Sequence, residues 1–205
     1  LQLILGLAEN IAHEQDLAAV HEQAAEIIEA VKRTSALCRD LTRYARRNVA
    51  NDDTEVNVNG KLDEALRIAR YAVTLQDMTI VKQYGSEVPV KGNPDELLHV
   101  FVNLITNAVQ AMTERGTLTL RTEHDHGTVI VTIMDTGCGI PRESLSKIFD
   151  PLYTTKPAGK GTGLGLYNVM SVVSKMHGHI IVDSEVGNGS SFRIEFPPAS
   201  KPIEC

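Results

Sequence analysis

The sequence is poor in aromatic residues and contains no long apolar run. Tryptophan is absent and aromatic residues make up 4% of the 205 positions, so the stacking platforms that bind single-stranded nucleic acid are not expected. The formal net charge of −6 disfavours binding to a phosphate backbone, which requires a basic surface. No segment approaches the roughly 18 apolar residues of a membrane span. The sequence therefore predicts no nucleic-acid partner and no membrane contact within its own length.

Cysteine is also scarce. Cys38, Cys138 and Cys205 are far apart and odd in number, so they predict neither a disulfide framework nor a metal site. This usage is typical of a reducing compartment, and no signal-peptide pattern opens the sequence, so we expect a cytoplasmic location. The first residues lack a methionine and continue an apolar pattern. We therefore expect a longer parent protein, and the sequence leaves open whether that protein is anchored in a membrane.

The apolar residues that are present follow two different periods. Between Val20 and Ala45, small or apolar side chains recur in alternating steps of four and three, the heptad spacing of a helix packed against other helices. A shorter pattern precedes it, and the polar stretch His13–Asp16 separates the two. Residues 1–50 are predicted to form a helical hairpin that dimerises into a four-helix bundle, because one hairpin alone buries too little apolar surface. A hairpin packed on its own domain is the alternative.

A polar linker at 48–53 leads to a second predicted domain over residues 54–198. Asn93 and the proline after it mark a helix start, and the strand patterns at 117–123 and 128–134 are rich in β-branched residues. Strands are predicted at 55–58, 78–84, 117–123, 128–134, 180–182 and 191–196, and helices at 60–72, 93–112 and 163–176. The predicted fold class is α+β, in which an α/β sandwich places helices on one face of a mixed sheet.

Two motifs in this domain suggest ligand binding. Asn103 and Asn107 share one face of a predicted helix, and an amide oxygen is a hard, neutral ligand for Mg²⁺; solvated or capping asparagines are the alternative. Asp135 follows an apolar strand in the motif Asp135-Thr-Gly-Cys-Gly-Ile140. Such a carboxylate accepts a hydrogen bond from an exocyclic amine like that of adenine, and the glycines allow the backbone to approach a ring closely. A strand-to-helix turn capped by the aspartate is the alternative.

Two further segments suit a phosphate site. Lys160–Gly165 is glycine-rich and precedes a predicted helix, so its backbone N–H groups can cradle phosphates; a flexible loop is the alternative. Ile148–Lys156 combines the apolar anchors Phe149 and Leu152 with a polar tip, as in a lid that carries a cation to a terminal phosphate. An ordinary surface lysine is the alternative for its last residue.

Taken together and in their order along the chain, the motifs resemble the ATPase domain of two-component sensor histidine kinases. They match the family's N, first glycine, F and second glycine boxes, and Gly187–Phe192 resembles the final box, with Ser190 where the family usually has threonine. The resemblance covers about residues 55 to 197, and the Thr-Thr-Lys ending is most similar to the nitrogen-regulator type. It implies the sandwich fold shared with gyrase, the heat-shock chaperone ATPase and the mismatch-repair ATPase, with ATP and Mg²⁺ as ligands.

The resemblance also implies roles for single residues. Asn107 coordinates Mg²⁺ with Asn103 nearby, Asp135 holds the adenine amine, and Lys156 faces the γ-phosphate; Asn103 and Lys156 are the implied catalytic residues. Gln110 stands where many relatives have a basic residue, so neutralising the phosphates would depend more on Lys156 and the metal. The implied nucleotide-binding set is Asn103, Asn107, Asp135, Gly137, Gly139, Ile140, Phe149, Thr154, Thr155, Lys156, Gly161, Thr162, Gly163, Leu164, Gly165, Leu166 and Ser190.

The implied function is protein-histidine kinase activity. In the hydrolases of the superfamily a glutamate at the position of Asn103 activates water, and a neutral amide cannot take that proton. The implied partners are a second copy, bound through the N-terminal helices, and the receiver domain of a response regulator. A nucleotide-binding adaptor or phosphotransfer module without kinase activity and a gyrase-type hydrolase are the alternatives.

The phosphoacceptor pattern of the family, His-Glu-x-x-Asn/Arg-Pro-Leu, is absent from the sequence. Ala12-His13-Glu14 is the nearest string and lacks the proline. We therefore interpret His13 and His21 as surface residues and expect the acceptor upstream of Leu1.

Overall fold

The structure is a computed structural model, and it describes residues 6, 10–11, 16–28, 31, 54–72, 78–112, 115–156 and 161–199. The chain divides into two units, Leu1–Val49 with Thr154–Thr162, and Ala50–Tyr153 with Gly163–Cys205. Among the described residues, no helix is long and apolar enough to cross a membrane.

The N-terminal part of the first unit contains a helix over residues 17–28. Asp16 begins it, since the Asp16 carboxylate accepts a hydrogen bond from the Ala18 N–H at 3.0 Å, as an N-terminal cap does. Of the predicted seam, Val20 and Ile27 are half-buried, whereas Val31 is 46% exposed. The remainder of the predicted hairpin lies outside the described residues, so the hairpin itself stays a prediction.

The second unit is built on a five-stranded mixed sheet in the order β2-β4-β5-β7-β6. Strand β2 runs parallel to β4, and the other neighbours are antiparallel. The strands are β2 Met78–Tyr84, β4 Gly116–Asp125, β5 Thr128–Asp135, β6 His179–Glu185 and β7 Gly189–Phe196. The predicted mixed sheet and α+β class are confirmed.

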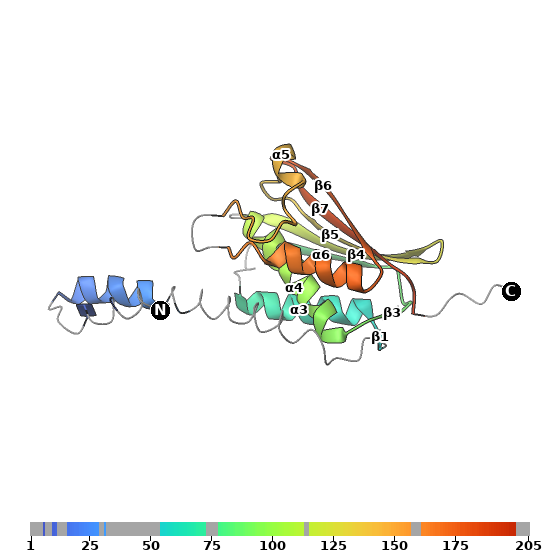
Figure 1. The fold of residues 1–205 in the computed structure, drawn as a ribbon, viewed down its shortest axis with the longest axis horizontal. Coiled ribbons are helices and arrows are strands. Elements are labelled where there is room, and N and C mark those ends of the chain that lie inside the picture. The colour runs from blue at the N-terminus through green and yellow to red at the C-terminus, as the bar shows by residue number, and fades with distance from the viewer. Residues whose placement is uncertain are drawn as a thin grey trace. The chain divides into compact units, whose positions relative to one another are not determined.

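Three helices cover one face of this sheet (Figure 1). They are α3 Val58–Ala72, α4 Pro94–Ala111 and α6 Gly165–Lys175. The middle helix α4 is capped by Asn93, whose side chain accepts hydrogen bonds from the Asp95 and Glu96 N–H groups at 2.9 and 3.2 Å. The core between helices and sheet is aliphatic, as the scarcity of aromatic residues required, and only Phe101 and Phe196 are fully buried aromatics among the described residues.

Two short elements were not predicted from the sequence. Strand β3 Val90–Lys91 pairs with β1 Glu55–Val56 in a separate two-stranded sheet, and α5 Arg142–Leu145 is a single helical turn. The prediction of a strand at 55–58 was too long, because Val58 already begins helix α3.

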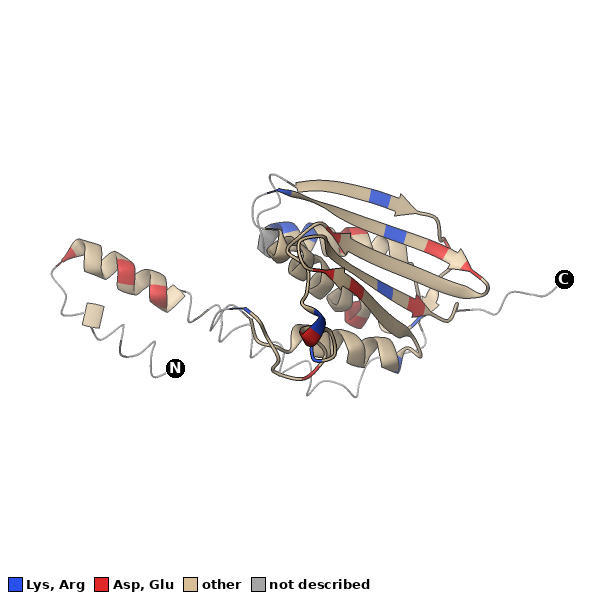
Figure 2. Cartoon of the chain, turned by 90° about the horizontal axis from the view of Figure 1, so that it is seen from above, with Lys and Arg blue, Asp and Glu red and all other residues tan. Residues whose placement is uncertain are grey.

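The opposite face of the sheet carries polar and charged side chains. Figure 2 shows basic and acidic positions along its strands. Two ion pairs lie along single strands, Arg121 with Glu123 at 2.8 Å and Arg193 with Glu195 at 2.9 Å. The alternation of inward apolar and outward polar residues follows from the period of two in a strand.

Candidate functional site

Several sequence motifs meet at the end of the sheet where β5 ends and β7 begins. Asp135 is the last residue of β5 and pairs with Ser190 in antiparallel β7. The first glycine motif packs on the end of α4, since the Cys138 N–H donates to the Ala111 carbonyl oxygen at 3.0 Å. A Cβ on Gly137 would lie 2.7 Å from Ala111, so only glycine allows this contact without displacement.

The asparagine pair lies beside the start of helix α6. Asn103 and Asn107 are half-buried on α4, on a face that does not enter the core. Gly165 is the first residue of α6, and a Cβ there would lie 3.8 Å from the Asn103 Oδ1 atom. Among the described residues no side chain caps α6, so its first N–H groups and its positive dipole end suit an anion. Residues far apart in the sequence thus bring amide oxygens and helix N–H groups together.

Asp135 is a buried carboxylate at the end of β5, 6% exposed. Its Oδ1 atom accepts a hydrogen bond from the Gly137 N–H at 2.8 Å. Burial raises the pKa of Asp135 above its usual value, while the N–H groups of Gly137 and Ser190 act in the opposite direction. Burying a carboxylate is costly unless it is hydrogen-bonded, and the Gly137 N–H supplies such a bond. The approach of a ligand to Asp135 stays a prediction.

Two glycines with positive φ lie at the same end of the sheet. Gly139 has φ +71° and Gly189 has φ +87°. A Cβ on Gly139 would collide with the Glu185 carbonyl oxygen, and one on Gly189 with the Asp135 carbonyl oxygen. Backbone segments therefore approach one another here more closely than any side chain would permit.

Ser184 on β6 is a site residue that sequence reasoning missed. Its Oγ atom accepts a hydrogen bond from the Ile140 N–H at 2.8 Å and lies 3.0 Å from the Ser190 Oγ atom. Ser184 thereby connects the first glycine motif with Ser190, the residue predicted beside the adenine. The alternation of the strand could have indicated this position, because Ser184 follows Ile180 and Val182 on the inward-facing side of β6.

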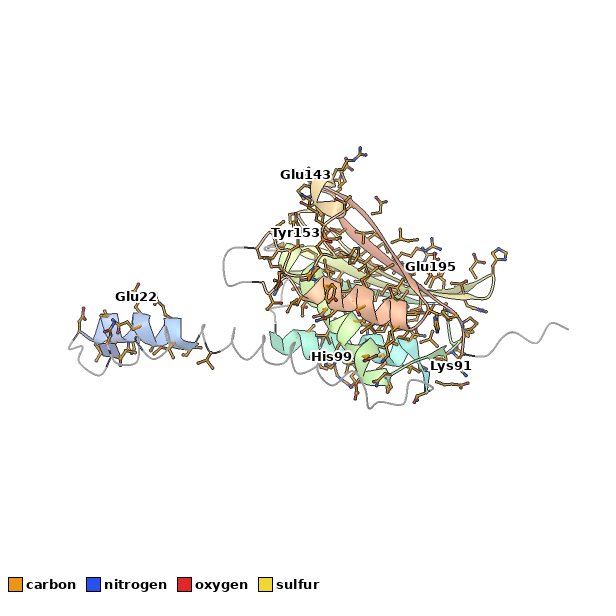
Figure 3. All side chains as sticks on the ribbon, viewed as in Figure 1. Glu22, Lys91, His99, Glu143, Tyr153 and Glu195 are labelled. Carbon is orange, nitrogen blue, oxygen red and sulfur yellow. The ribbon has the colours of Figure 1, made fainter. Side chains whose placement is uncertain are left out.

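The F motif forms the base of a loop. Phe149 and Ile140 are half-buried and packed on the core. The Tyr153 hydroxyl, labelled in Figure 3, donates to the Ser144 Oγ atom at 2.9 Å. The Leu152 N–H donates to the Gly163 carbonyl oxygen at 3.0 Å, so the two ends of the loop meet. Gly163, Leu164 and Leu166 follow at the start of α6, all half-buried.

The remaining predicted site residues belong to the first unit. Within it, the Lys156 N–H donates to the Thr154 Oγ1 atom at 3.2 Å, and a Cβ on Gly161 would lie 2.7 Å from that same oxygen. Burial lowers the pKa of the Lys156 ammonium group. Thr155 is exposed, Thr162 is half-buried, and residues 157–160 lie outside the described residues. The approach of these side chains to a nucleotide stays a prediction.

Residues 92–200, more than half of the chain, match the family described as "Histidine kinase-, DNA gyrase B-, and HSP90-like ATPase". The chain belongs to this ATPase family. The match contains the asparagine pair, Asp135, both glycine motifs and Ser190.

Curated relatives in this ATPase family include sensor kinases. The sensor kinase CckA of Brucella abortus (strain 2308) is 35% identical over 181 residues, which cover 80% of this chain and 19% of CckA. The sensory histidine kinase/phosphatase NtrB of Rhodobacter capsulatus is 35% identical over 162 residues, 72% of this chain and 44% of NtrB. The chain thus spans less than half the length of either relative.

The fold of the family is also found in a solved structure. The mycobacterial sensor histidine kinase MprB superposes with a TM-score of 0.62 at 26% identity, covering 71% of this chain and 97% of that one. The prediction of a histidine-kinase-type ATPase domain is therefore confirmed.

The raised pKa of Asp135 predicts how the stability of this ATPase domain depends on pH. Because the folded pKa lies above the unfolded value of 3.8, the carboxyl opposes folding only once it ionises. The free-energy cost of the ionised, buried carboxyl is absent below pH 3.8 and complete above the pKa of the folded state. We expect the melting temperature of Asp135→Asn, minus that of the unchanged protein, to grow as pH rises through this window and then to level off. A difference that shrinks with rising pH, measured without nucleotide, would contradict the assignment.

Proposed function

We propose that this chain binds Mg-ATP and is the catalytic core of a protein-histidine kinase. In this proposal the γ-phosphoryl group is transferred to a histidine of the dimerisation helix and then to an aspartate of a response regulator. The observation that carries the proposal is the buried carboxylate of Asp135 in a glycine-lined site, joined by the fold to the asparagine pair and the start of α6. The family match and the sensor-kinase relatives support it.

Asp135 binds the base of the nucleotide in this proposal. Its carboxylate accepts a hydrogen bond from the exocyclic amine of adenine, and Gly137 and Gly139 let the ring lie against the backbone. Ile140 and Phe149 provide apolar contacts from half-buried positions. Enclosing the adenine excludes water, which strengthens this hydrogen bond.

The phosphates lie at the start of α6 in this proposal. The N–H groups around Gly163, Leu164 and Gly165 donate to phosphate oxygens, and Leu166 packs behind them. Thr154, Thr155, Lys156, Gly161 and Thr162 close over the γ-phosphate from the loop. Lys156 supplies the cation, and the lowered pKa of its ammonium is reversed by the negative phosphate.

The residues present fit a magnesium ion. Among the described residues, no three His, Cys, Asp or Glu side chains cluster to hold a metal, so the ion would need ligands from the nucleotide. Asn107 would offer an amide oxygen, with Asn103 beside it, and phosphates and waters would supply the other ligands. The ion would supply charge neutralisation at the phosphates, and Gln110, exposed and uncharged, cannot do so.

Asn103 favours a kinase over a hydrolase. A carboxylate at this position would take a proton from water, and an amide cannot. Bound ATP therefore keeps its γ-phosphoryl group until a histidine reaches it. This step needs only positioning and charge stabilisation, which is the general requirement of phosphoryl transfer.

The same proposal assigns residues 1–50 to a dimerisation hairpin and residues 54–198 to the ATP-binding domain. Two copies would pair through the seam that includes Val20 and Ile27, and a receiver domain would dock near it. The relative NtrB supports the nitrogen-regulator subtype. A cytoplasmic location accompanies this function.

The test is incubation of the chain with Mg²⁺ and γ-labelled ATP. We expect binding, slow release of free phosphate, and no stoichiometric label, because none of the seven histidines stands in the acceptor pattern. A separate protein that carries a His-Glu-x-x-Asn-Pro helix should acquire acid-labile label slowly, and the same protein with alanine at that histidine should not. Rapid ATP turnover would indicate a hydrolase. Tight binding without transfer would indicate an adaptor. Label on His13 or His21 would show that the hairpin is placed wrongly.

A further inference from the structure

Ser184 makes three contacts through its hydroxyl, and the donor in each contact can be assigned. Its Oγ atom receives the Ile140 N–H at 2.8 Å, donates to the Gly189 carbonyl oxygen at 2.8 Å and lies 3.0 Å from the Ser190 Oγ atom. A hydroxyl has one proton and two acceptor positions. A carbonyl oxygen only accepts and an N–H only donates, so the single proton of Ser184 goes to Gly189.

In the contact between the two serines either hydroxyl could donate, and the bond from Ser184 to Gly189 decides which one does. Since the proton of Ser184 is used, the Ser190 hydroxyl must donate to Ser184. This donation fills the second acceptor position of Ser184, and all its hydrogen-bonding capacity is satisfied. The proton of the Ser190 hydroxyl then points toward Ser184, and the Ser190 Oγ atom has only acceptor positions left for a ligand.

Ser190 and Asp135 lie in directly paired positions of β7 and β5. Both are buried, 7% and 6% exposed. The backbone N–H of Ser190 is one of the groups that act to lower the pKa of Asp135. Asp135 and Ser190 therefore present two side-chain acceptors in paired positions of the two strands.

We propose that Ser184 is a positioning residue for base selection, which fixes Ser190 as an acceptor beside Asp135 and so favours a 6-aminopurine over a 6-oxopurine. The inference rests on the proposed function, since it concerns the base of the same nucleotide. A 6-amino group brings two hydrogens to two acceptors. The 6-oxo group of inosine or guanosine triphosphate brings a third acceptor, which leaves buried groups unpaired and is strongly disfavoured.

A structural role alone makes a different prediction. If Ser184 only ties the Ile140 backbone to β6, its removal weakens the binding of every nucleotide alike. If it orients Ser190, its removal frees that hydroxyl to rotate and donate. The unchanged Asp135 still favours the amine, but the penalty for the 6-oxo group falls. The ratio of ATP to ITP affinity therefore separates the two roles.

The experiment measures the dissociation constants of Mg-ATP and Mg-ITP by calorimetry for the full chain and four variants. We expect the unchanged protein to prefer ATP about tenfold or more, and Ser184→Ala and Ser190→Ala to reduce that preference about threefold or more. Ser184→Thr keeps the hydroxyl and should restore the preference. Ser191→Ala, on the adjacent outward position of β7, is the matched control and should leave it unchanged.

The outcomes separate this proposal from the proposed function. If the unchanged protein binds neither nucleotide, the ATP site itself is wrong. If it prefers ATP and Ser184→Ala keeps the same ratio, the ATP site stands and the role of Ser184 is overturned. Should Ser184→Ala not fold, as its melting curve would show, Ser190→Ala decides: an unchanged ratio there overturns the proposal.

Discussion

Asp135→Asn is expected to weaken Mg-ATP binding about ten- to a hundredfold, since a hydrogen bond to a charged group contributes roughly 1.5–3 kcal/mol. The asparagine has nearly the same size and still offers an oxygen to the Gly137 N–H. Its NH₂ group, however, replaces an acceptor with a donor opposite the adenine amine. Calorimetry with Mg-ATP measures the loss.

The matched control for this variant is Asp183→Asn. Asp183 is an exposed aspartate on β6, on the face of the sheet opposite the helices, and its substitution changes the net charge equally. Its affinity for Mg-ATP should stay within about twofold of the original, because a lone surface charge is screened. Unchanged affinity in a folded Asp135→Asn protein would refute the adenine assignment.

Gly189→Ala is expected to reduce the free energy of unfolding by several kcal/mol and to abolish nucleotide binding. Two costs add at this position. A non-glycine residue at φ +87° costs roughly 1–2 kcal/mol, and the new Cβ collides with the backbone of Asp135 and Thr136. Backbone cannot rotate away as a side chain does, so overpacking adds about 1–3 kcal/mol or more.

Gly187→Ala carries the first cost alone, so the difference between the two variants measures the second. Gly187 has the same φ of +87°, and a Cβ there meets nothing within 4 Å. Urea denaturation should show a loss of about 1–2 kcal/mol for Gly187→Ala and a clearly larger loss for Gly189→Ala. Equal losses would show that a Cβ at position 189 is accommodated.

Helices and strands with strong local signals were predictable from the sequence. Met78–Tyr84 has the predicted bounds, and α4 begins one residue after its predicted cap, Asn93. Strand β3 was missed because a two-residue strand has no periodicity of its own and exists only as the partner of β1. The helical seam could be predicted as a pattern, but periodicity alone does not say which surface covers it.

The site was predictable where its residues form motifs. The asparagine pair, Asp135 and the glycines carry chemistry that ordinary turns do not require, and their order pointed to the family. Ser184 belongs to no motif, and its importance depends on the registration of β6 with β7, where it pairs with Ser190. A shift of that register by one residue would turn Ser184 to the outer face of the sheet.

The sequence by itself determined the residue types, the α+β class and the family, because local patterns and the order of motifs are properties of the sequence alone. Only the tertiary structure decided which groups touch. The Ile140 N–H reaches Ser184 across 44 positions of sequence, and Gly189 lies against Asp135 across more than 50. Such contacts depend on strand order and register, which are set by the burial of the whole core, and no local pattern encodes them.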